Sequence, residues 1–287
     1  KKKSEGKAVM KGLGIRKMRD PCSVWASSSG EKSYICGDYR VQTNIKFLID
    51  MRLLLISNSA SPGETYLEKP GADIARHLGD AKGDVVFIPF AGVTMTFDDY
   101  VTKVNAALAP HGVKVRGIHT FDEPLRAIAE AKAIMIGGGN TFRLLKMMQE
   151  SGIINAIRER VKAGVPYVGW SAGANVACPT ICTTNDMPIV EPLSFEALGF
   201  VPFQINPHYL DAHPEGHGGE TREQRIREYL VANPGVRVVG LREGSRMFYE
   251  GGKLTLVGEH TARLFLFGDE PREVAPSEDV NFLLRKP

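Results

Sequence analysis

The chain has 287 residues, of which 43% are hydrophobic, and a formal net charge of +3 at pH 7. This composition is that of a folded globular protein, and it excludes collagen-like, cysteine-stapled and largely disordered chains. No apolar run approaches the roughly 20 residues that cross a bilayer, so we expect no membrane association.

Residues 1–50 differ from the rest of the chain, because they hold eleven Lys and Arg against five Asp and Glu. They are rich in Lys, Gly and Ser without helical or strand periodicity, which indicates a segment outside the fold. We interpret it as an appended segment, disordered or non-native, that derives from a vector or an untranslated leader. An organelle-targeting peptide and a nucleic-acid tail stay open as alternatives, but interleaved aromatic residues are lacking, and we predict no nucleic-acid partner.

From residue 51 onward, short β-rich apolar runs alternate with longer helical patterns, which is typical of a parallel sheet covered by helices. We therefore predict one α/β domain over residues 51–287, with a mostly parallel sheet flanked by helices. The predicted strands are Arg52–Ser57, Asp84–Pro89, Val113–Ile118, Ala133–Ile136, Pro166–Trp170, Pro202–Ile205 and Arg237–Leu241. The predicted helices, with apolar residues three and four apart, are Thr96–Leu108, Pro124–Ala131, Thr141–Glu150, Ile153–Ala163 and Thr221–Val231.

The pattern changes near the C-terminus. Met247–Tyr249 and Lys253–Val257 flank the pair Gly251-Gly252, which predicts a hairpin, and Ala262–Phe267 predicts a further strand. We expect an antiparallel edge in this part of the chain.

The most informative motif is Gly169-Trp170-Ser171-Ala172-Gly173, which lies between a predicted strand and a helix-compatible stretch. A strand that turns sharply into a helix leaves a serine exposed on a tight bend, as in the nucleophile elbow of serine hydrolases. The pattern alone is weak in a chain with 30 glycines, and Ser171 as a turn residue or helix N-cap is the alternative. The context favours acyl transfer through Ser171.

A serine nucleophile needs a base and an acid that orients this base. Such groups are expected at the carboxyl ends of strands in an open parallel sheet. His208 follows the apolar run that ends at Ile205, and Glu243 follows the strand that ends at Leu241. We therefore predict His208 as the base and favour Glu243 as the acid over its competitor Asp186, which could instead brace a loop or bind the substrate amine.

The glycine-rich run Gly137-Gly138-Gly139-Asn140 follows a predicted strand and precedes a helix start at Thr141. Its unhindered backbone amides are suited to bind an oxyanion. We expect the amides of Gly139 and of Ala172, the residue after the nucleophile, to be the donors. A phosphate-binding loop would use the same chemistry, but a Gly-Lys-Ser/Thr ending and a full dinucleotide fingerprint are both missing, and we predict no cofactor.

The four cysteines are scattered, without disulfide-framework or zinc spacing, and are consistent with a reducing compartment. His213 and His217 flank Pro214-Glu215-Gly216, where proline and glycine disrupt the helical face that a metal-binding pair would need. We predict a cytoplasmic location and no metal site.

Taken together, these motifs resemble peptidase E, the α-aspartyl dipeptidase family of serine peptidases. The resemblance covers residues 51 to about 267 and rests on the stretches Leu54–Ser59, Phe87–Thr94, Gly137–Phe142, Gly169–Asn175, Thr184–Val190, Asn206–His208 and Gly219–Arg225. It implies a flavodoxin-like fold of the class I glutamine amidotransferase type.

The family's functional residues match positions that the motifs already indicated. The nucleophile matches Ser171, the base His208 and the acid Glu243, and the oxyanion amides match those of Gly139 and Ala172. The resemblance therefore implies a Ser-His-Glu triad.

The resemblance also implies a substrate. The family cleaves dipeptides, and some tripeptides, that begin with aspartate, and its acid-recognising arginine matches Arg222, whose guanidinium can bind a carboxylate through two parallel hydrogen bonds. We expect Asn140 and Asp186 to contribute to substrate binding. The expected activity is that of a serine exopeptidase acting on Asp-Xaa peptides through an acyl-enzyme on Ser171, as a monomer or homodimer.

Two other functions are open. A cyanophycinase-like hydrolase of β-aspartyl-linked peptides shares an elbow of this kind. A non-catalytic protein that binds small acidic ligands would use the same scaffold without turnover.

Overall fold

A computed structural model of the chain describes residues 50–211, 216 and 218–285. The segment predicted to be appended therefore lies outside the described residues, apart from Asp50. The strands and α-helices of the described part are, in chain order, β1 (Leu53–Ile56), α2 (Glu68–Leu78), β2 (Val85–Ile88), α3 (Phe97–Leu108), β3 (Val115–Gly117), α4 (Pro124–Glu130), β4 (Ala133–Ile136), α5 (Thr141–Glu150), α6 (Ile153–Lys162), β5 (Tyr167–Trp170), α7 (Ala172–Asn175), β6 (Gln204–Tyr209), α8 (Arg222–Ala232), β7 (Arg237–Arg242), β8 (Arg246–Glu250), β9 (Lys253–Val257), β10 (Ala262–Leu266) and β11 (Arg272–Val274).

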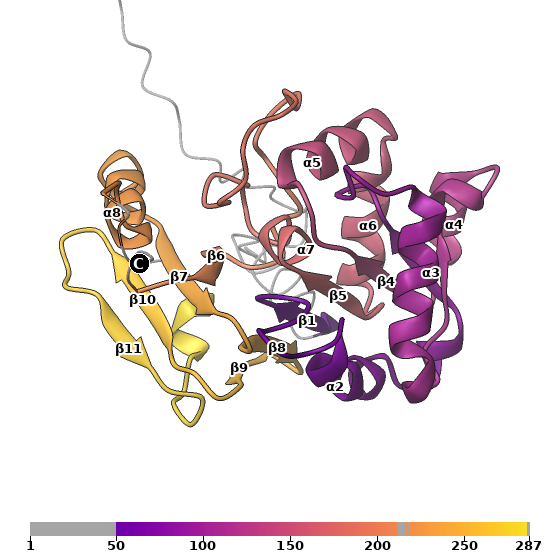
Figure 1. Ribbon diagram of the computed structural model, residues 1–287, viewed down its shortest axis with the longest axis horizontal. Coiled ribbons are helices and arrows are strands. Elements are labelled where there is room, and N and C mark those ends of the chain that lie inside the picture. Colours follow the sequence, from indigo (N-terminus) through magenta and orange to yellow (C-terminus); the bar gives the residue numbers. More distant parts are fainter. Residues whose placement is uncertain (1–49, 212–215, 217, 286–287) are drawn as a thin grey trace, which may run out of the picture. The chain divides into compact units, whose positions relative to one another are not determined.

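The first sheet has seven strands in the order β3-β2-β4-β5-β1-β8-β9 (Figure 1). Strands β1 to β5 pair in parallel. The C-terminal strands β8 and β9 extend the β1 side as an antiparallel edge. The predicted α/β fold with a mostly parallel sheet and an antiparallel C-terminal edge is confirmed.

The parallel strands are buried on both faces, because helices cover each side of the sheet. Successive side chains of a strand point to opposite faces. Leu53 and Leu55 of β1 accordingly pack in one core cluster with side chains of α4, α5 and α6, whereas Leu54 and Ile56 pack in another with side chains of α2 and α3. This double burial explains why these strands appear as continuous apolar runs in the sequence.

The second sheet has four strands in the order β11-β10-β7-β6. Here β6 and β7 are parallel, and β10 and β11 are antiparallel additions. Helix α8 covers this sheet, with Ile226 and Leu230 packed against Tyr209, Val238 and Phe265; these elements are orange to yellow in Figure 1. Strands β6 and β7, which the sequence pattern groups with the parallel strands β1 to β5, thus belong to a separate sheet. The edge of β1 that they could have joined is occupied by β8.

Helix α2 was not predicted. Pro70 and Gly71 fall within its first turn and weaken the helical pattern, yet proline is tolerated there because first-turn amides have no intrahelical acceptor. In the described part of the chain, none of the helices combines the length and apolar character needed to cross a membrane.

Candidate active site

Ser171 lies on the tight turn between β5 and α7. Its backbone has φ 52° and ψ −111°, a conformation that is costly for a residue with a side chain, and its amide donates to the Ile56 carbonyl at 3.0 Å. A Cβ on Gly173 would lie 2.2 Å from the Ile136 carbonyl oxygen, so this position needs glycine. Ser171 occupies the N-cap position of α7 but makes no side-chain capping bond. Its hydroxyl is thus left available to the site.

His208 meets Ser171 from the other sheet. It lies at an irregularity near the end of β6, with φ 54°. Its Nε2 is 2.9 Å from Ser171 Oγ, and its Nδ1 is 2.7 Å from Glu243 Oε1. A proton on Nδ1 donates to the carboxylate and leaves Nε2 as an acceptor for the serine hydroxyl. The structure therefore brings the three predicted triad residues together, in the order that general-base activation of a serine requires.

Asp186, the competitor for the acid position, makes different contacts. Its Oδ2 accepts hydrogen bonds from the Thr141 amide at 2.7 Å and from Thr184 Oγ1 at 3.1 Å. A carboxylate stabilises the positive end of the α5 dipole at this place. The hydrogen-bond partner of His208 Nδ1 is Glu243, whereas Asp186 binds the backbone at the start of α5.

Two residues at the end of β1 hold the triad backbone, and the sequence analysis assigned them no role. Buried Ser57 Oγ accepts from the His208 amide at 2.9 Å and donates to the Leu241 carbonyl at 2.7 Å, so it joins β1 to both β6 and β7. Asn58 Oδ1 accepts from the Gly244 amide at 2.8 Å and fixes the turn that carries Glu243. The available signal was a pair of polar residues directly after a buried strand.

The two predicted oxyanion donors are not used in hydrogen bonds within the described part of the protein. The amides of Gly139 and Ala172 have no acceptor among the described residues. The neighbouring loop is held firmly, because Tyr100 Oη donates to the Gly138 carbonyl at 2.9 Å and the Asn140 amide donates to the Ala91 carbonyl at 2.8 Å. Free amides on a fixed loop are suited to bind developing negative charge.

The side chain of Asn140, predicted to bind substrate, is engaged in structural contacts. Its Oδ1 caps α5 by accepting from the Arg143 amide at 3.0 Å, and its Nδ2 donates to the Met187 carbonyl at 2.8 Å. Asn140 nevertheless lines the cavity next to Ser171. Any part that it takes in binding substrate must therefore be compatible with these two bonds.

Arg222 is the first residue of α8, whose N-terminus is fixed by a capping box between Thr221 and Gln224. It donates to Asn185 Oδ1, and Asn185 Nδ2 in turn donates to the Pro207 carbonyl at 2.6 Å, next to His208. Burial and the nearby Arg225 lower the pKa of Arg222, while Asp186 acts in the opposite direction. A partly buried guanidinium beside a second cation is suited to receive a carboxylate.

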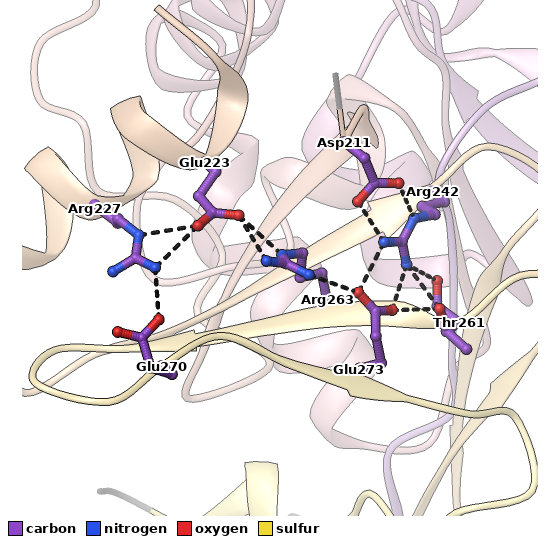
Figure 2. Close-up of polar contacts among 8 residues, drawn as sticks. All are labelled: Asp211, Glu223, Arg227, Arg242, Thr261, Arg263, Glu270 and Glu273. Carbon is purple, nitrogen blue, oxygen red and sulfur yellow. Dashed lines mark hydrogen bonds and ion pairs between the residues drawn. The ribbon is translucent and has the colours of Figure 1, made fainter.

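Ion pairs connect the elements that carry His208, Glu243 and Arg222. Figure 2 shows an alternating series of acidic and basic side chains that runs from α8 across β10 and β11 to the end of β7. We call this series the ion network. Its members are Asp211, Glu223, Arg227, Arg242, Arg263, Glu270 and Glu273. Arg242, directly before Glu243, makes bidentate contacts with both Asp211 and Glu273. The Arg242 guanidinium lowers the pKa of Glu273 to about 2. Glu273 therefore stays ionised at neutral pH.

A cavity of about 380 Å³ opens beside Ser171 and His208. Its lining includes Tyr66, Val93, Met95, Tyr100, Lys103 and Gly139. Burial raises the pKa of Tyr66 and of Tyr100, so both phenols stay neutral hydrogen-bond donors. The cavity is at the small end of the roughly 300–1,000 Å³ typical of small-molecule sites.

In the described part of the chain, no group of three or more His, Cys, Asp or Glu side chains is arranged to hold a metal ion. The pair His213 and His217 lies outside the described residues. Of the cysteines, Cys178 and Cys182 are described, and both are free thiols. Burial raises the pKa of the Cys178 thiol to about 12, so this cysteine stays protonated and unreactive.

The chain is similar to known peptidases. Residues 53–257 match the model of peptidase family S51. Peptidase E of Citrobacter koseri is 54% identical to the chain over 220 residues, which make up 77% of this chain and 96% of that protein.

Two solved structures are similar as well. One is a Listeria monocytogenes protein with the provisional name peptidase E, at 25% identity and a TM-score of 0.55, covering 73% of this chain and 98% of that one. The other is a peptidase from an acI-B1 Actinobacterium, at 15% identity and a TM-score of 0.56, covering 82% of this chain and 98% of that one. At that identity, the second likeness supports the fold alone.

Proposed function

The chain belongs to peptidase family S51, and we propose that it cleaves small peptides after an N-terminal aspartate, with Ser171, His208 and Glu243 as its catalytic triad. The membership confirms the resemblance to peptidase E and the interpretation as a serine peptidase. The observation that carries the proposed triad is the hydrogen-bonded series from Ser171 Oγ through the His208 ring to Glu243.

The first half-reaction forms an ester. His208 Nε2 takes the Ser171 proton as Oγ attacks the carbonyl carbon of the aspartyl residue, and the amides of Gly139 and Ala172 bind the oxyanion. Protonated His208 then gives its proton to the leaving amine, the C–N bond breaks, and an aspartyl ester of Ser171 remains. Glu243 keeps the imidazole in one tautomer and stabilises its charged form.

The second half-reaction releases aspartate. Water attacks the ester carbonyl carbon while His208 Nε2 takes its proton, and the same two amides bind the second oxyanion. Collapse of this intermediate breaks the ester bond, and His208 returns the proton to Ser171 Oγ. These steps use only groups of this chain and water.

Arg222 accounts for the aspartate preference in this proposal. Its guanidinium lies on the α8 N-terminus, linked through Asn185 to the backbone beside His208. An aspartate side chain can form a bidentate pair with it, whereas an alanine side chain leaves the partly buried cation unpaired.

The test is release of free leucine from Asp-Leu, Glu-Leu, Ala-Leu and β-Asp-Leu by the wild type, Ser171→Ala and Arg222→Ala, with a chelator present. We expect cleavage of Asp-Leu alone, its loss in Ser171→Ala, and a collapse of the Asp-Leu over Ala-Leu preference in Arg222→Ala. Cleavage of β-Asp-Leu instead would support the cyanophycinase-like alternative. Ligand-induced stabilisation without turnover would support the binding protein.

We also propose a cytoplasmic location, since the described cysteines are free thiols, as expected in a reducing compartment. The proposed partner is the peptide substrate, without nucleic acid or membrane, and the proposed assembly is a monomer or homodimer. Fractionation of the native host tests the proposed location, and analytical ultracentrifugation tests the proposed assembly.

A further inference from the structure

Lys103 stands out in the cavity beside Ser171. It lies on α3, and among the described residues that line the cavity it carries the one permanent charge. Besides the triad residues Ser171 and His208, the lining comprises glycine backbone, apolar side chains and neutral polar or aromatic ones, namely Ser59, Thr94, Asn140, Trp170, Tyr66 and Tyr100. Lys103 is exposed, so its ammonium lies at the solvent-facing edge of the cavity. A cation without an acidic partner at the edge of a small cavity beside a nucleophile is placed to pair with a ligand carboxylate.

The Lys103 ammonium has a defined position but no acidic partner. Its Nζ lies 4.3 Å from the centre of the Tyr66 ring, within cation–π range. No carboxylate of the described residues forms an ion pair with it. Tyr66 Oη in turn donates to Tyr100 Oη at 3.4 Å, and Tyr100 donates to the Gly138 carbonyl beside the oxyanion amides. The cation is thus held on the same framework as the candidate catalytic loop.

Arg222 and Lys103 lie on different elements around the nucleophile. Arg222 begins α8 and contacts Asn185, and it is absent from the lining of the cavity, whereas Lys103 lines that cavity from α3. If the aspartate side chain binds Arg222, the residue that follows the aspartate, which is the leaving group, occupies the cavity. The exposed Val93 and Met95 on the rim offer apolar contact to its side chain.

We propose that Lys103 binds the free α-carboxylate of the residue that follows the aspartate, and so selects substrates that end at this residue. The inference rests on the proposed function, since it assigns the leaving-group side of the same site. The small volume of the cavity then restricts the length of the peptide that fits, and the charge of Lys103 favours a peptide whose terminal carboxylate lies beside it. A longer peptide would place a neutral amide where the carboxylate should lie.

The test compares Asp-Leu with Asp-leucinamide, which differs only in lacking the terminal charge. We expect Lys103→Gln to lower kcat/KM for Asp-Leu by roughly 10- to 100-fold, the range for a hydrogen bond to a charged group, and to leave kcat/KM for the amide nearly unchanged. Lys103→Arg keeps the charge and should keep most of the preference for the free acid.

Lys114→Gln is the matched control, because it removes one exposed lysine directly before β3, at the end of the sheet opposite the strand ends that carry the site. It should change neither substrate's kinetics. An equal loss for both substrates in Lys103→Gln, or no loss for either, would overturn the role of Lys103 while the proposed function stands. Failure of the folded wild type to cleave either substrate would overturn the proposed function and this inference together.

Discussion

Two regions of the molecule meet at the candidate site and hold their parts in different ways. The nucleophile region, which is the seven-stranded sheet with its helices, presents Ser171 and the Gly139 amide through close backbone contacts and apolar packing. The base region, which is the four-stranded sheet with α8, presents His208, Glu243 and Arg222 and is joined by the ion network of Figure 2.

The difference indicates that the two halves of the site respond to different perturbations. In the nucleophile region, an added methyl group meets backbone that cannot move aside. In the base region, removal of one charge leaves partly buried partners uncompensated. Buried Ser57 is the direct bridge, since it bonds the backbone of both β6 and β7 from the end of β1.

The largest expected effect is in the base region, at Glu243. Glu243→Gln should lower kcat for Asp-Leu by about 10⁴-fold, because an amide neither fixes the His208 tautomer nor stabilises the imidazolium. Asp186→Asn should cost far less, since Asp186 contacts the Thr141 amide and Thr184. Steady-state kinetics with both variants check this ranking, and the reverse ranking would refute the assignment of Glu243.

In the nucleophile region, Gly139→Ala should lower kcat by about 10²- to 10³-fold, the range for losing one oxyanion donor. Gly139 has φ 133°, and a Cβ there would lie 2.2 Å from the Ala91 carbonyl oxygen, so the loop must move. Gly152→Ala is a useful control, because that glycine also has positive φ but has no atom near its Cβ position. Equal kcat in the two variants would contradict the role of the Gly139 amide.

The ion network allows a test that moves the base region without touching substrate. Arg242→Gln should lower kcat by roughly tenfold through a small displacement of Glu243, with little change in KM. The control Arg126→Gln removes exposed ion pairs of α4 in the nucleophile region and should change neither kcat nor the melting temperature measurably. A kcat unchanged in Arg242→Gln would show that the network stabilises the fold alone.

The two regions contain groups that lose their contribution to the unfolding free energy over different ranges of acidic pH. His77 lies in the nucleophile region and is buried against Phe248. Burial and the charge of Arg52 lower the pKa of His77 from 6.5 to about 4, and together they outweigh the opposite effect of Glu250. Between these values the unfolded chain binds the proton and the folded protein does not, so the unfolding free energy should fall by roughly 3 kcal/mol as the pH drops from 6.5 to 4.

His77→Leu should remove this part of the pH dependence, as urea denaturation between pH 4 and 7 would reveal. In the base region, Glu273 of the ion network responds at lower pH, because its folded pKa is about 2 against an ordinary 4.5. The stabilisation that Glu273 contributes is complete above pH 4.5 and is lost as the pH falls toward 2. Parallel pH profiles for wild type and His77→Leu would contradict the assignment to His77.

Local patterns in the sequence determined much of this protein. Strands buried on both faces appear as continuous apolar runs. Glycines at fixed spacing indicate the elbow around Ser171 and the loop at Gly139. These features follow from steric rules that act over a few residues, so a single chain is enough to predict them. Comparison with peptidase family S51 then confirmed the fold and the class of enzyme.

Other features required the tertiary structure. The placement of β6 and β7 in a second sheet depends on β8 taking the open edge of β1, and no local pattern carries that information. The choice of Glu243 over Asp186 as the partner of His208, the bridge made by Ser57, and the unpaired Lys103 over Tyr66 likewise depend on contacts between residues far apart in the chain. Such contacts are decided by which strand edges and side-chain partners remain free once the core has packed, and that is a property of the whole fold.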